Sequence, residues 1–259
     1  MKGKNYFFTS RLVCFNETFG CMANASDTAV LWHEAIAGRN ADHVASAFHA
    51  LMCAYSESVK HFIFWTDNCG PQNKNWTLFS SFFNILAEPN GPSSITMKYL
   101  EKGHTFMRSD SIHGLIGKKL KREPEVLDFA DLEKLIQSVK GDLKIISLTA
   151  SDFLPFSPFQ ARGSALPKLK LIRELRFDKG SNLFKYKLDL DSPTYFTRTF
   201  TFREISSVPL SENRVRGLNP NKKNEICRVL VPQMPVNKRH FWESLVESSV
   251  ADLGKTPAS

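Results

Sequence analysis

The sequence contains no apolar run approaching the roughly 20 residues that a transmembrane helix requires. Its opening, MKGKNYFFTS, is polar and lacks the apolar segment of a secretory signal peptide. We therefore expect no membrane partner and no secretion. The expected location is the nucleus or the cytoplasm.

Cysteine is scarce and its spacing is irregular. The five cysteines form no CxxC pair and no Cys/His zinc pattern, and their odd number does not suit a disulfide framework. We predict reduced thiols with mainly structural roles. They are Cys14, Cys21, Cys53, Cys69 and Cys227.

Positive charge is in excess. The 259 residues carry 34 Lys and Arg against 26 Asp and Glu, a formal net charge of +8, and the pI is near 9.2. A basic surface favours a polyanion, so DNA, or alternatively RNA, is the natural partner. Each cluster equally fits a solvated face. The clusters are Lys118, Lys119, Lys121 and Arg122; Lys168, Lys170, Arg173 and Arg176; and Arg214, Arg216, Lys222 and Lys223.

The most informative segment is residues 61–75, HFIFWTDNCGPQNKN. HFIFW is typical of a buried strand, and WTLFSSFFNIL that follows is typical of a helix. Asp67 then lies at the carboxyl end of a strand, where open α/β sheets place their sites and where helix N–H groups attract phosphate. The polar residues after it are predicted nucleic-acid contacts. They are Asn68, Gln72, Asn73, Lys74 and Asn75.

A simpler interpretation of this segment stays open. Asp and Asn in a turn between a strand and a helix commonly cap the helix. The density of amides around Asp67 exceeds what capping needs, and amides bind phosphates without adding charge.

A second polar segment covers residues 103–122, GHTFMRSDSIHGLIGKKLKR. Ser109 or Asp110 can cap a helix that continues to about Leu120, with Asp110 and His113 on one face. If this face meets the Asp67 turn, the carboxylates can hold Mg²⁺ or Mn²⁺. His104 then becomes another ligand or a general base. The alternative is that Asp110 only caps the helix and His113 is a surface residue.

These segments resemble an uncharacterised family of transposon-derived proteins with a predicted RNase H-like domain, of the DDE transposase or integrase type. The likeness is strongest in FWTDNCGPQNKN and KYLEKGHTFMRSDSIHGLIGKKLK. It extends to YFFTSRLVCFNETFG, to AVLWHEAIAGRNADHVASAFHALM and to KKNEICRVLVPQMPVNKRHFWESL. The middle region, about residues 142–212, is the weakest part.

The resemblance implies three acidic side chains that hold two metal ions for phosphoryl transfer. Asp67 matches the second acid. The third is either Asp110 or a position where relatives commonly carry an acid and this chain has Gly117. The opening strand with the first acid is expected to be absent, since the chain starts in what resembles the following strand. The implied function is nucleic-acid binding with a degenerate, inactive catalytic site.

The expected fold class is α/β, an RNase H-like mixed sheet with flanking helices. We predict the RNase H-like domain at 1–141, a connector rich in Pro and Phe at 142–167, a small antiparallel β region at 168–206 and a helical segment at 207–259. In the β region, aromatic and basic residues interleave. They offer a stacking platform for nucleic acid, or else pack inward while the lysines are solvated.

Two other functions remain open. The same fold could be a non-enzymatic module that binds DNA or protein, with Asp67 and Asp110 as caps. Alternatively, an unrelated hydrolase could bind one metal ion through two His and two Asp. Those four candidate ligands are Asp67, His104, Asp110 and His113.

Overall fold

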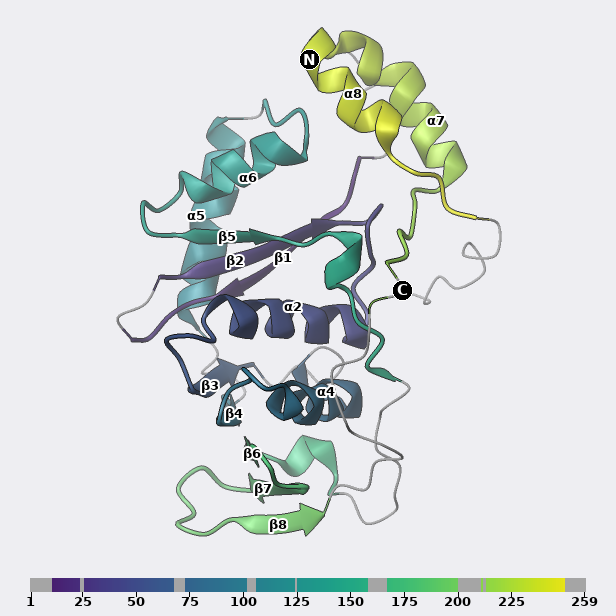
Figure 1. Ribbon diagram of the computed structural model, residues 1–259. Helices are drawn as coiled ribbons and strands as arrows, with labels where there is room; N and C mark the ends of the chain where they lie inside the picture. Colours follow the sequence, from purple (N-terminus) through teal and green to yellow (C-terminus); the bar gives the residue numbers. More distant parts are fainter. Residues whose placement is uncertain are drawn as a thin grey trace. The chain divides into compact units, whose positions relative to one another are not determined.

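The computed structural model describes residues 11–23, 26–67, 73–101, 106–123, 125–157, 167–199, 211 and 213–249. The chain divides into two compact units, each assembled from separate stretches. Unit 1 contains residues 1–38, 107–150 and 213–259, and unit 2 contains residues 39–106 and 151–212. Both combine a sheet with helices, which confirms the α/β class (Figure 1).

Unit 1 is built on a three-stranded sheet in the order β1-β2-β5. β1 (Cys14–Phe19) pairs antiparallel with β2 (Thr28–His33), and β5 (Lys144–Ser147) pairs parallel with β2. Every residue of β2 is buried, as expected for the central strand. α5 (Arg108–Arg122) and α6 (Phe129–Gln137) join its apolar cluster through Ile112, Ile116, Leu135 and Ile136.

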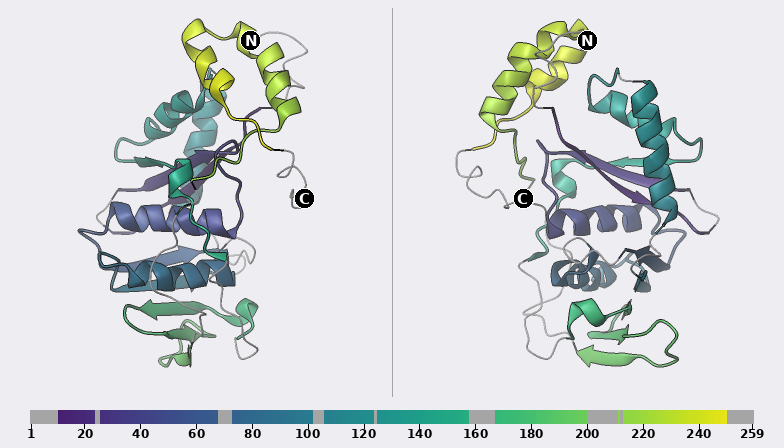
Figure 2. Two further views of the ribbon diagram at one scale, coloured as in Figure 1. Left: turned by 45° about the vertical axis from the view of Figure 1, so that its right-hand side comes forward. Right: turned by 180° about the vertical axis from the view of Figure 1, so that it is seen from behind.

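A second apolar cluster of unit 1 lies around its last helices. α7 (Pro220–Val229), the short 3-10 helix η4 (Val231–Gln233) and α8 (Val236–Ser244) pack together (Figure 2). Trp242 is 8% exposed, and its indole N–H donates to the carbonyl of Leu127 at 2.8 Å. This one side chain therefore fastens α8 to the segment before α6.

Unit 2 is built on a five-stranded sheet in the order β3-β4-β6-β7-β8. β3 (His61–Thr66) and β4 (Ser94–Tyr99) are parallel, and α4 (Trp76–Ala87) connects them along the chain. α2 (Ala41–Ala54) packs on α4. The other strands are antiparallel: β6 (Glu174–Asp178), β7 (Leu183–Lys187) and β8 (Phe196–Thr199). Two further 3-10 helices are η1 (Ala150–Asp152) and η3 (Leu169–Leu171).

The core of unit 2 is rich in phenylalanine. Phe177 of β6 is fully buried and lies 5.1–6.4 Å, between ring centroids, from four other phenylalanines. These are Phe79, Phe82, Phe83 and Phe184. Aromatic pairs at such distances contribute packing energy beyond the area they bury, so α4 is held firmly on the sheet.

Several details differ from the sequence-based expectation. The described strands form two sheets instead of one mixed sheet. The predicted antiparallel region at 168–206 continues the β3-β4 sheet, because β6 pairs with β4. β3 is an edge strand with alternating burial, and Ile63 is 61% exposed, so the strand is not buried on both faces. No helix in the described ranges has the length and hydropathy to cross a membrane.

Candidate functional site

Asp67 directly follows β3 in unit 2 and is partly buried. Its Oδ1 accepts a hydrogen bond of 2.9 Å from the side-chain amide of Asn73. The N-cap of α4 is a different residue, Asn75, whose side chain accepts from the N–H of Leu78 at 2.8 Å. The structure therefore separates the cap of α4 from the carboxylate, and Asp67 lies at the carboxyl end of β3 as predicted.

Asn73 and Lys74, which precede α4, contact residues at the end of the sheet. The hydroxyl of Tyr99, at the end of β4, donates to the carbonyl of Asn73 at 2.9 Å. Lys74 is only 4% exposed, and its ammonium donates to the carbonyl of Ile172 at 2.5 Å and lies 4.2 Å from the centre of the Tyr99 ring. Burial is the larger cause and repulsion from Arg173 the smaller, and together they lower the pKa of Lys74 to about 8. Lys74 is thus buried within unit 2 and does not face a polyanion.

Asp110 belongs to the first turn of α5 in unit 1. Its Oδ2 accepts a 2.7 Å hydrogen bond from the backbone N–H of Met107, the residue before the helix. Asp110 is exposed, as is His113 one turn later. This contact satisfies an N–H at the helix start, which is the structural role that the sequence left as an alternative.

Gly117 lies within the same helix, and among the described residues no atom other than those of the adjacent residues and of the helix's own backbone lies within 4 Å of a Cβ placed there. A glycine inside a helix costs about 1 kcal/mol relative to alanine. Packing therefore gives no reason for glycine at the position where the resemblance implies an acid.

The basic residues at the end of α5 are not all alike. Lys118, Lys121 and Arg122 are exposed, whereas Lys119 lies 3.6 Å from the carboxylate of Glu123. α5 and α6 also line an open depression that mixes both charges. Its charged residues are Lys119, Arg122, Glu123, Glu125, Asp131 and Lys134. The basic residues of α5 that remain available to a partner are therefore the exposed Lys118, Lys121 and Arg122.

Three of the predicted site residues, Asn68, Gln72 and His104, lie outside the described residues. The two predicted carboxylates belong to different units, Asp67 to unit 2 and Asp110 to unit 1. The shared metal site that they were predicted to form stays a prediction.

The aromatic residues of the β7-β8 edge divide into two groups. Phe184 and Tyr186 are buried, as in the inward-packed interpretation. Tyr195 and Phe196 are 36% and 52% exposed, and the ammonium of Lys187 lies 4.6 Å from the centre of the Tyr195 ring. The outer group therefore presents aromatic surface beside positive charge.

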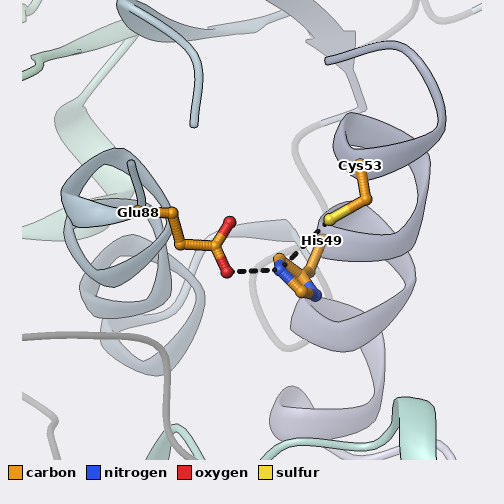
Figure 3. A group of neighbouring side chains, drawn as sticks. All are labelled: His49, Cys53 and Glu88. Atoms are coloured by element: carbon orange, nitrogen blue, oxygen red, sulfur yellow. Dashed lines mark hydrogen bonds and ion pairs between the residues drawn. The ribbon is translucent and has the colours of Figure 1, made fainter. Parts of the chain in front are cut away.

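Sequence analysis missed a polar cluster in unit 2 that consists of His49, Cys53 and Glu88 (Figure 3). Nε2 of His49 lies 3.1 Å from Oε1 of Glu88 and 3.3 Å from Sγ of Cys53. Burial lowers the pKa of His49, but the hydrogen bonds to the thiol and the carboxylate outweigh burial and raise it to about 9. His49 thus holds its proton more strongly than an ordinary histidine. The available signal was the His/Cys spacing of four residues on one helix.

Asp27 in unit 1 was also missed. Its side chain is 1% exposed. Its carboxylate accepts two hydrogen bonds from the guanidinium of Arg108, at 2.7 and 3.0 Å, and one from Lys140 at 2.6 Å. The N–H of Cys21 adds a fourth at 2.8 Å. These contacts tie the start of α5 and the turn before β5 to the start of β2, so the role of Asp27 is structural.

Known proteins offer limited comparison. No curated protein matches the chain, and no solved structure matches it. Residues 39–156 match a protein family described as a domain of unknown function (DUF7869). The match runs from α2 to the segment after η1, and it includes Asp67, Asp110 and the His49 cluster.

Proposed function

We propose that the protein binds nucleic acid through an RNase H-like, transposon-derived core in which Asp67 is the surviving ligand for Mg²⁺ or Mn²⁺ and phosphoryl transfer is lost. The position of Asp67 carries this proposal. It follows a strand of a parallel β3-α4-β4 unit, where a side chain faces the ligand-binding end of the sheet. Asn73 orients the carboxylate, and another residue caps the helix.

The order of elements supports the RNase H-like part of the proposal. Two antiparallel strands, a helix, a strand, a helix, a parallel strand and a helix follow one another from β1 to α5. This alternation of strands and helices is compatible with an RNase H-like α/β core. The two separate sheets are a departure from it.

We infer the loss of phosphoryl transfer from α5, which does not supply a further carboxylate for a two-metal site. Two-metal catalysis depends on several carboxylates that fix both ions. Asp110 bonds to the N–H of Met107, and Gly117 has no carboxylate to offer. A single ion at Asp67 can still bridge the protein to a phosphate oxygen without cleaving the strand.

The expected binding is sensitive to salt and tolerant of sequence. We expect a fluorescent single-stranded oligonucleotide to bind in fluorescence anisotropy, and we expect no cleavage in Mn²⁺. Replacing Lys118 and Lys121 with Gln should lower the slope of log K against log salt by about 1.4, because each phosphate contact on a single strand contributes about 0.7. Phe196→Ala should weaken binding by about 1–3 kcal/mol if a base stacks on the ring.

Val236→Ala is the matched control for Phe196→Ala. Like Phe196, Val236 is an exposed apolar residue, with 78% exposure, and it lies in unit 1, away from the β7-β8 edge of unit 2. It should leave affinity unchanged. Affinity that is independent of salt, or equal in all the variants, would contradict nucleic-acid binding by these surfaces.

A further inference from the structure

The cluster of His49, Cys53 and Glu88 brings three different metal-ligating atoms to one point of unit 2. An imidazole nitrogen, a sulfur and a carboxylate oxygen all lie within 4.8 Å of one another. In Figure 3 the three side chains point toward a common centre, two from α2 and one from the end of α4. Neighbouring ligands of a tetrahedral Zn²⁺ stand about 3.3–3.6 Å apart, as the Zn–N, Zn–O and Zn–S bond lengths require. The observed separations of 3.1 and 3.3 Å from Nε2 are close to these values.

The two ligands on α2 are placed by the helix itself. His49 and Cys53 are four residues apart, so both side chains lie on one face. The neighbouring residue Phe48 anchors α2, since its ring lies 4.9 Å from the ring of Phe64 in β3 and 5.9 Å from that of Phe82 in α4. The helix face that carries the ligands therefore has a fixed orientation toward α4.

Glu88 is held by its backbone. It is the C-cap of α4, directly after Ala87, and its N–H donates to the carbonyl of Ile85. The ammonium of Lys179 donates to the carbonyls of Glu88 and Pro89 at 2.7 and 3.1 Å. Gly91 closes the turn with a hydrogen bond to Glu88, and a Cβ there would lie 2.2 Å from the carbonyl of Ile85. The turn is thus fixed, and the carboxylate does not need a large rearrangement to bind an ion.

We propose that His49, Cys53 and Glu88 form a Zn²⁺ site with its fourth position open to water or to a further ligand. This inference is independent of the role assigned to Asp67. Mg²⁺ and Ca²⁺ prefer sites made of oxygen, whereas a thiolate and an imidazole select Zn²⁺ and other late transition metals. Three protein ligands with an open position distinguish this arrangement from a closed structural zinc site.

Cobalt titration of the full-length, metal-free protein tests the proposal. Co²⁺ replaces Zn²⁺ in tetrahedral sites, and a thiolate ligand gives a sulfur-to-cobalt charge-transfer band beside intense d–d bands. We expect one Co²⁺ per chain and bleaching of both bands by one equivalent of Zn²⁺. Cys53→Ser should remove the charge-transfer band and weaken Zn²⁺ binding by about 100-fold or more, since even loss of an outer-shell partner costs 10–100-fold.

Cys227→Ser is the matched control, because Cys227 is a free thiol in unit 1 and its removal should leave both bands intact. Cys53 is exposed, so its replacement by Ser should not prevent folding, and circular dichroism of the metal-free variant verifies this. His49→Ala and Glu88→Gln should each weaken Zn²⁺ binding while retaining the fold. A charge-transfer band that survives in Cys53→Ser, or no Zn²⁺ binding by the wild-type protein, would overturn the site.

Discussion

Asp27→Asn is expected to lower the free energy of unfolding by about 2–4 kcal/mol. Removing one charge from a buried ion pair leaves its partners uncompensated, which typically costs 3–5 kcal/mol. Here Arg108 and Lys140 are 48% and 32% exposed, so water can partly replace the lost carboxylate and the cost falls somewhat below that range. Urea denaturation followed by circular dichroism measures the difference.

The same carboxylate gives a defined pH dependence. Burial alone would raise the pKa of Asp27, but hydrogen bonds from Arg108, Lys140 and the N–H of Cys21 outweigh it and lower the pKa below 3.8. Because the folded pKa lies below the unfolded one, the stabilisation is complete above about pH 5 and is lost as pH falls through the folded value. Asp27→Asn should remove the part of the unfolding free energy that is lost at acidic pH.

Asp142→Asn is the control for Asp27→Asn. Asp142 lies 3.1 Å from the same Lys140 but is 55% exposed, so its ion pair is screened by water. We expect a change below about 1 kcal/mol. Equal losses in the two variants would contradict the structural role of Asp27.

Phe177→Ala should destabilise unit 2 by about 3–5 kcal/mol, the usual cost of removing a buried phenylalanine ring. The ring is 0% exposed and is surrounded by aromatic residues of α4 and β7, so the cavity cannot close by a local shift. Phe196→Ala in the same sheet removes a ring that is 52% exposed and should cost less than about 1 kcal/mol. Urea denaturation distinguishes the two, and similar losses would contradict the assignment of Phe177 to the core.

Local patterns predicted the elements around Asp67 well. HFIFWT forms β3, WTLFSSFFNILA forms α4, and α5 begins near Asp110, because each follows from hydrophobic periodicity and turn residues within a short window. The helix predicted to reach about Leu120 ends at Arg122. The α/β class follows from the same patterns.

Contacts between segments that are distant in the sequence could not be predicted from such local patterns. The pairing of β6 with β4 joins segments about 80 residues apart, so the region at 168–206 looked separate in the sequence. Asp27 meets its partners 81 and 113 residues away. Lys74, a lysine in a polar turn, was expected at the surface, yet Tyr99 and the carbonyl of Ile172 provide an internal place for its ammonium.

The candidate zinc ligands combine a local sequence pattern with a contact between distant segments. The four-residue spacing of His49 and Cys53 is present in the sequence, but it belongs to no CxxC pair and to no Cys/His zinc pattern. Glu88 is 39 residues beyond His49, and only the packing of α2 on α4 brings it there. The sequence can therefore indicate the two ligands on α2, but the third ligand is identified only from the packing of the folded chain.

Calorimetric titration with Mn²⁺ in the presence of a single-stranded oligonucleotide tests the central proposal most directly. We predict that the wild-type protein and Asp110→Asn bind one ion, and that Asp67→Asn does not, because Asp67 supplies the carboxylate and Asp110 is engaged with the N–H of Met107. Unchanged Mn²⁺ binding in Asp67→Asn, or none in the wild-type protein, would contradict a metal-binding role for Asp67.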